Sequence, residues 1–116
     1  MGSNDQIVKD LHKCIWKDNV EELRRLLMEI EKEHHDPDSV LTISMLPINS
    51  RFRGNTPLCL AIMLGRRECI KQLIEHGASC LVATAAGFYP LSEAISLGDR
   101  AILELVIKSR LNELRN

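Results

Sequence analysis

Apolar residues recur along this chain at the three- and four-residue spacing of a helix. The clearest run is Ile70, Leu73 and Ile74, which would line one face of a helix and bury it. The same spacing, read with proline at helix starts and glycine at helix ends, predicts helices over 6–17, 20–32, 57–64, 67–76, 90–97 and 100–113. The apolar run at 40–46 fits a short strand or a helical turn, and its sequence does not decide between them.

The chain also repeats itself with a period of 33 residues. The positions that match at this offset are Gly54 and Gly87, Pro57 and Pro90, Leu58 and Leu91, and Ala61 and Ala94. The register continues through Gly65 and Gly98, Ile70 and Leu103, Leu73 and Val106, and Ile74 and Ile107. Such self-similarity predicts stacked copies of one structural unit.

A weaker copy precedes these two at an offset of 47 residues, in which Leu11 matches Leu58 and Asp18 matches Gly65. The offset exceeds the period by 14 residues. We expect the excess in a loop over 33–49, because insertions between repeats cost little. The chain is then one domain over 6–113, with repeats over 6–32, 51–80 and 84–113.

A period of 33 residues that opens on Thr56-Pro57-Leu58 resembles the ankyrin repeat, a turn followed by two antiparallel helices. Proline fits the first helical turn, where its missing N–H costs nothing, and Gly54 permits the tight turn before it. The resemblance implies an all-α solenoid of three helix-turn-helix repeats. It also implies a protein-binding module rather than an enzyme.

A narrower resemblance rests on Trp16-Lys17-Asp18-Asn19, Arg53-Gly54-Asn55-Thr56-Pro57-Leu58 and Gly87-Phe88-Tyr89-Pro90-Leu91. These segments resemble the N-terminal region of the ankyrin repeat domain-containing protein thirteen family, endosomal adaptors that bind ubiquitinated membrane cargo. The resemblance implies a cytoplasmic, endosome-associated adaptor. In that family short acidic helices near the C-terminus hold ubiquitin, so we expect this chain to be only the N-terminal module. The insertion at 33–49 departs from the family's compact first loop, and a shared partner does not follow.

Ankyrin stacks bind partners along a concave face, formed by the turn tips and the exposed flank of each first helix. By position, the partner-binding residues expected here are Phe52, Arg53, Asn55 and Phe88 at the tips, and Trp16, Lys17, Met63, Leu64, Ser96 and Leu97 on the first helices. Six of them are apolar, enough for a contiguous binding patch. Alternatively, Trp16 and Leu97 could pack inward, and the repeats could merely support a following domain.

The charge and the hydropathy of the chain each argue against one class of partner. The chain has a formal net charge of −1, with six basic and ten acidic residues in 1–50 and nine and six in 51–116. This surplus is too small for a nucleic-acid footprint, and no apolar stretch approaches the roughly 20 residues of a membrane span. Four arginines near the second turn would meet an acidic partner or simply lie in solvent: Arg51, Arg53, Arg66 and Arg67.

No catalytic residue, metal site or cofactor is expected. The cysteines, Cys14, Cys59, Cys69 and Cys80, form no C-x-x-C pair and should be reduced. A nucleophilic pair of one of the last three with His76 is less expected than buried thiols. His34, His35 and Asp36 could bind a metal but more simply are solvated, and His12 should hydrogen-bond a neighbouring loop.

The last predicted helix carries more apolar residues than a repeat requires. Leu111 and Leu114 extend its apolar stripe past the normal repeat end. A terminal repeat needs a polar outer side or a covering element. We therefore expect weak homodimerisation through this C-terminal helix.

Overall fold

The computed structural model describes residues 3–33 and 46–115. Within them the helices are α1 (Ser3–Trp16), α2 (Val20–Glu33), α3 (Pro57–Met63), α4 (Arg67–Glu75), α5 (Pro90–Leu97) and α6 (Arg100–Arg115), with a short 3-10 helix η2 (Pro47–Asn49). All six predicted helices are present, with ends within three residues of the expected ones. Of the apolar run at 40–46, only Leu46 is described, and it lies in a bend.

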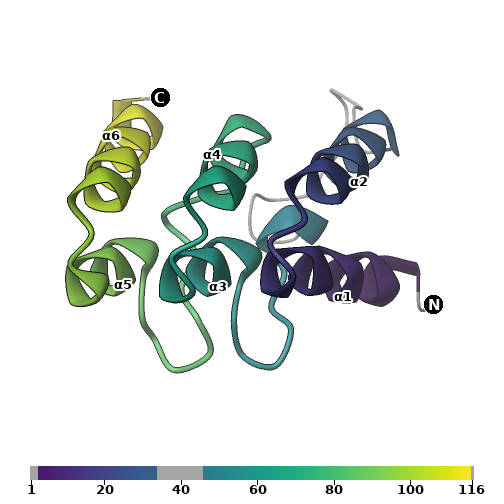
Figure 1. Cartoon of the computed structure of the whole chain (residues 1–116), viewed down its shortest axis with the longest axis horizontal. Coiled ribbons are helices and arrows are strands. Elements are labelled where there is room, and N and C mark those ends of the chain that lie inside the picture. The colour runs from purple at the N-terminus through teal and green to yellow at the C-terminus, as the bar shows by residue number, and fades with distance from the viewer. Residues whose placement is uncertain (1–2, 34–45, 116) are drawn as a thin grey trace.

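The helices form two layers of a short stack (Figure 1). The first helices α1, α3 and α5 lie side by side, and α2, α4 and α6 form the second layer. The loops before α3 and α5 project beyond the first layer as the two tips of the stack. The expected all-α solenoid of three helix-turn-helix repeats is confirmed.

Helix boundaries follow from local chemistry at the predicted positions. Pro57 and Pro90 occupy the first turns of α3 and α5. Thr56 caps α3, because its Oγ1 accepts the N–H of Cys59 at 3.1 Å. Gly98 ends α5 with φ 77°, in the left-handed region that glycine adopts without strain. Asp18 takes the equivalent place after α1 with φ 55°.

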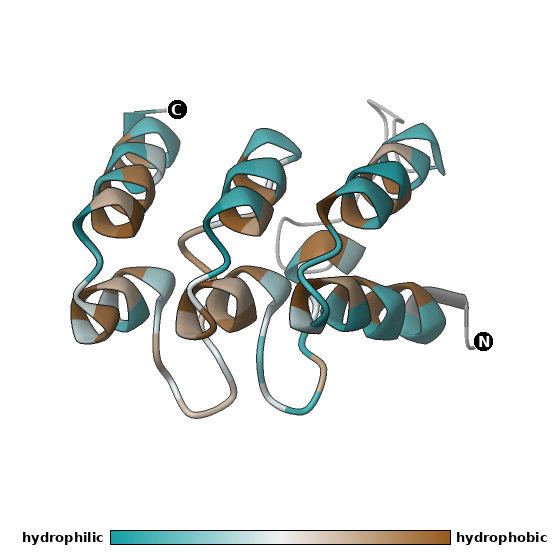
Figure 2. Cartoon of the chain, in the orientation of Figure 1, coloured by the Kyte–Doolittle hydropathy of each residue, from teal (hydrophilic) through white to brown (hydrophobic). Residues whose placement is uncertain are grey.

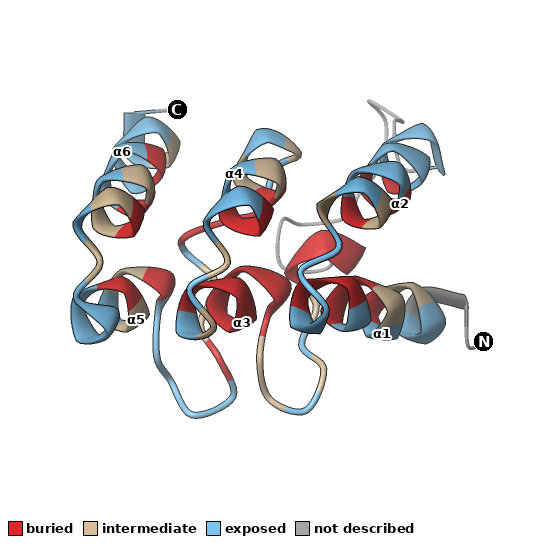
Figure 3. Cartoon of the chain, in the orientation of Figure 1, coloured by how far each residue is buried: buried red, intermediate tan, exposed pale blue. Residues whose placement is uncertain are grey.

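The core lies between the two layers and between neighbouring repeats. In Figure 2 the apolar sides of the helices face one another, and Figure 3 shows α3 almost wholly buried. The largest fully buried aliphatic side chains are Leu11, Ile15, Leu23, Leu27, Leu58, Ile62, Ile70, Leu73, Ile102 and Val106. They come from all three repeats, so each repeat buries its apolar face against its neighbours.

We expected a loop over all of 33–49, but both ends of this segment are helical. Glu33 still belongs to α2, and Pro47, Ile48 and Asn49 form η2 and are buried. This short helix packs against α1, α2 and α3. Asn49 Oδ1 accepts the N–H of Ser79 at 2.8 Å. Burial of Ile48 together with this hydrogen bond makes the end of the insertion part of the core.

Three of the four arginines near the second turn join one repeat to the next. Arg66 donates to the carbonyl oxygens of Ile15 and Trp16 at 3.3 and 2.9 Å. Arg51 donates to Ala83 O at 2.8 Å, and Arg67 pairs with Asp99 at 3.2 Å. Their contacts are therefore structural, whereas Arg53 contacts the ring of its neighbour Phe52.

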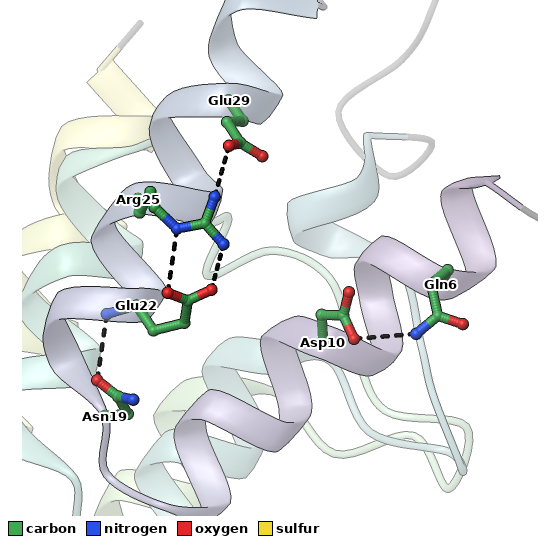
Figure 4. A network of polar contacts seen from close by, with 6 residues as sticks. All are labelled: Gln6, Asp10, Asn19, Glu22, Arg25 and Glu29. Atoms are coloured by element: carbon green, nitrogen blue, oxygen red, sulfur yellow. Dashed lines mark hydrogen bonds and ion pairs between the residues drawn. The ribbon is translucent and has the colours of Figure 1, made fainter.

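Polar side chains cover the N-terminal end of the stack (Figure 4). On α2 the Arg25 guanidinium binds the Glu22 carboxylate and, at 2.6 Å, that of Glu29. The hydrogen bond from Arg25 lowers the pKa of Glu22 below its ordinary value. On α1, Gln6 donates to Asp10 at 2.9 Å. These groups give the first repeat a hydrated outer side.

The C-terminal end of the stack differs from the N-terminal end. Its helix α6 ends two residues later than expected. Its Glu113 carboxylate accepts the Ser79 hydroxyl at 2.6 Å and the N–H of Cys80 at 2.5 Å. This contact fastens the end of α6 to the loop after α4. Leu111 and Leu114 nevertheless remain exposed, as the extended apolar stripe predicted.

Candidate protein-binding face

The concave face has exposed apolar side chains at the ends of its first helices. Trp16 is 59% exposed and Met63 48% exposed, at equivalent ends of α1 and α3. Leu97 and Ser96 are exposed at the end of α5, and Phe88 is exposed at the second tip. The alternative that Trp16 and Leu97 pack inward is therefore wrong.

Three of the predicted residues are only partly exposed: Phe52, Asn55 and Leu64. Leu64, expected to be exposed, is partly buried and packs against the hydrophobic core, because it ends α3 where the chain turns toward α4. Asn55 is half-buried, and its backbone exchanges hydrogen bonds of 2.9 and 3.2 Å with Phe52. Asn55 thus closes the first tip and is not an exposed contact.

One cleft brings four of the ten predicted residues together. It has a volume of about 310 Å³ and lies between α1 and the first tip. Its lining consists of Lys9, His12, Lys13, Trp16, Lys17, Phe52 and Arg53. We call it the Trp16 cleft. Of the other six, Asn55 lies on the first tip outside the cleft lining, and the rest lie further along the face, at α3 and its end, on α5 and on the second tip.

His12 holds the floor of the Trp16 cleft. The ring is buried, with Nδ1 2.9 Å from Val8 O and Nε2 3.0 Å from Asn55 O. An N–H on either nitrogen can donate to the carbonyl that it faces. The expected hydrogen bond from His12 to a neighbouring loop is confirmed, and it positions the first tip against α1.

Two aromatic contacts position the cationic wall of the Trp16 cleft. The Phe52 ring meets the His12 ring edge to face, with centroids 5.2 Å apart and planes at 68°. The Arg53 guanidinium lies 5.4 Å from the centroid of the Phe52 ring, a cation–π contact. Arg53 has φ 54°, a left-handed conformation uncommon for residues other than glycine, in the tight turn that the Phe52–Asn55 bridge closes.

Three lysines on one side of α1 extend the positive charge of the Trp16 cleft. Lys9, Lys13 and Lys17 are all exposed and follow one another at i, i+4 and i+8, so they share a helix face. The sequence prediction included only Lys17. The four-residue spacing of these lysines, with Trp16 among them, was the signal that could have identified Lys9 and Lys13.

The thiols do not form a nucleophilic site. All four cysteines are buried, and burial is the largest cause that raises the pKa of each thiol, to about 12 for Cys69 and about 11 for Cys80. Cys69 donates to Asp18 Oδ1 at 3.6 Å in the preceding repeat, while His76 contacts Glu31. Since the thiolate is the reactive form, burial opposes catalysis here.

Metal and membrane chemistry find no support in the described ranges. In residues 3–33 and 46–115, no three His, Cys, Asp or Glu side chains come together as ligands for a metal ion. His34, His35 and Asp36 lie outside these ranges. None of the described helices combines the length and apolar character that crossing a membrane requires.

Comparison with known sequences assigns the repeats. A family model described as ankyrin repeats, in three copies, matches residues 11–114. Among curated proteins the chain is similar to ankyrin repeat domain-containing protein 13C from Mus musculus, 32% identical over 98% of this chain. The Homo sapiens 13C and 13B proteins are 33% and 31% identical over 90% and 86% of it. The resemblance to the thirteen family is thereby confirmed. The chain spans only 14–20% of the length of these relatives.

Proposed function

This chain belongs to the ankyrin-repeat family, a family of protein-interaction modules, and we propose that it is the partner-binding module of an intracellular adaptor. The partner lies along the concave face, over the ends of α1, α3 and α5 and the two tips. The observation that carries the proposal is the row of exposed apolar side chains there, led by Trp16 and Met63. Large apolar groups grouped on one face favour protein binding over unused surface.

The setting proposed for this adaptor is ubiquitin-linked endosomal trafficking in the cytoplasm. Its support is the similarity to the ankyrin repeat domain-containing protein 13 relatives. In cells, the tagged protein should overlap with an endosomal marker. A uniform distribution that does not follow the marker would contradict the endosomal part of the proposal. It would not affect the proposal of a binding module.

The rival proposal is structural, with the repeats supporting a following domain and binding no ligand of their own. The row of exposed apolar side chains favours the first proposal, because a mere support would not need such a surface. The two proposals differ in one measurable respect. Only a binding module loses a partner when its concave face is changed.

Met63→Glu tests the binding module. Met63 is exposed at the centre of the face, where anchors contribute most to affinity. Proximity labelling in cells should identify proteins that the wild-type chain labels and that Met63→Glu labels at least about tenfold less. Leu64 is a poorer target because it packs against the core. Circular dichroism should show unchanged helical content for the variant.

The matched control is Met28→Glu in the second layer, on α2. Met28 is 52% exposed and Met63 48% exposed, so the two changes are alike in chemistry and burial and differ in the face that they alter. Equal labelling by wild type and Met63→Glu, or equal losses with both variants, would contradict binding through the concave face and favour the structural role.

A further inference from the structure

The Trp16 cleft combines positive charge with an exposed aromatic surface. Four cations line it around the indole: Lys9, Lys13, Lys17 and Arg53. No carboxylate is among its lining residues. Asp10 and Glu22 line a neighbouring groove, which shares Lys13 and Lys17 with the cleft. A ligand in the cleft would therefore meet a positive potential and apolar surface at once.

The cleft is also held in place before any ligand arrives. Arg66 fixes the end of α1 through the Trp16 carbonyl oxygen at 2.9 Å, and His12 fixes the tip through Asn55. The indole stays 59% exposed between these two anchored elements. Because the backbone on both sides is anchored, little of it has to be ordered on binding, and the exposed tryptophan between these elements is a good anchor.

We infer that the Trp16 cleft binds a short acidic segment of a partner protein. One large apolar side chain of that segment packs against Trp16 and Phe52, and its carboxylates pair with the surrounding cations. The inference rests on the proposed function, because it gives the ligand chemistry of one part of the concave face. It adds a class of ligand that the ankyrin fold does not specify.

The size of the charged region selects a peptide over a long polyanion. Lys9 on α1 and Lys17 directly after it lie eight residues apart, about 12 Å at the helical rise of about 1.5 Å per residue. That length matches about four residues of extended peptide. A nucleic acid or an anionic bilayer would extend beyond the cleft to the neighbouring carboxylates of Asp10 and Glu22, which would repel it.

Selection from a random peptide library tests the inference. Peptides enriched on the wild-type chain should carry acidic residues on either side of a large apolar one. Their binding should shift the fluorescence of Trp16, the chain's single tryptophan. Trp16→Ala should weaken binding about thirtyfold or more by calorimetry. The double variant Lys9→Glu with Lys13→Glu should weaken it as much, and added salt should weaken wild-type binding.

Lys32→Glu with Lys108→Glu is the matched control. Both lysines are exposed on second-layer helices, so the net charge changes equally while the cleft is untouched, and affinity should hold. Circular dichroism should show that every variant is folded. Enrichment of neutral or basic peptides, or no enrichment above background, would overturn the inference.

Three further outcomes separate the alternatives. Acidic peptides that bind Trp16→Ala as tightly as wild type would show that the cleft is not their site. Peptides lost with Met63→Glu but retained by Trp16→Ala would support the binding module and overturn the acidic cleft. Tight binding of phosphatidylserine vesicles or of a single-stranded oligonucleotide, abolished by the lysine variants, would replace the peptide by another ligand class.

Discussion

The two ends of the stack are built from the same repeat but present opposite surfaces. At the N-terminal end, Glu22 and Arg25 of α2 form part of a charged network on the outer side. At the 47-residue offset they match Cys69 and Gln72 of α4. Cys69 is buried against the preceding repeat, where it reaches Asp18. Charged residues thus stand where an inner repeat has a buried one.

At the C-terminal end the outer surface keeps the chemistry of an inner repeat. Ile95 of α5 matches Ile62 of α3 at the 33-residue offset, yet Ile62 is 0% exposed and Ile95 is 61% exposed. Figure 3 shows the same contrast between the buried α3 and the exposed α5. The exposed Leu111 likewise matches the buried Ala78. Burial in a stack therefore depends on the neighbouring repeat. Of the two end repeats, only the first has polar residues where an inner repeat has buried ones.

The largest difference in stability is expected between variants of the two matched isoleucines. Ile62→Ala should lower the free energy of unfolding by about 2–5 kcal/mol, because it leaves a cavity in a packed core. Ile95→Ala should change it by less than about 0.5 kcal/mol, because most of that side chain already lies in water. Urea unfolding followed by circular dichroism measures both. Similar losses for the two variants would mean that the C-terminal end is covered in solution.

We also expect weak self-association, in which two copies pair through their C-terminal ends. Head-to-tail stacking would bury the Glu22 and Arg25 charges at a high cost, so a second copy should instead join C-terminal end to C-terminal end. Sedimentation equilibrium should detect weak association of the wild-type chain. Leu111→Lys with Leu114→Lys should reduce it and leave helical content nearly unchanged. A strict monomer at high concentration would contradict the pairing.

The smallest effect concerns the polar end. Arg25→Ala should leave the urea midpoint within experimental error, since exposed ion pairs contribute little. Arg66→Ala is the comparison. It should cost about 1 kcal/mol, because Arg66 donates to two carbonyl oxygens at the end of α1. If Arg25→Ala were the more damaging change, the N-terminal network would be part of the structural core and not only a hydrated covering.

The amino-acid sequence by itself determined the repeat and its helices. Local chemistry was sufficient there, since Pro57 and Pro90 start helices, Gly98 ends one, and the spacing of Ile70, Leu73 and Ile74 marks a buried face. Helical periodicity and capping act over a few residues, so they can be read without knowing what packs where. The same local signals missed η2, because a single turn has no periodicity to detect.

The surroundings of each residue could be known only from the tertiary structure. Ile62 and Ile95 hold equivalent positions, but among the described residues a following repeat packs only beside Ile62. Arg66 and Arg53 stand near the same turn, but one joins repeats and the other faces a cleft. The Trp16 cleft joins lysines of α1 to a tip about 40 residues later in the chain. Burial and charge grouping are properties of neighbours in space, which helical spacing does not record.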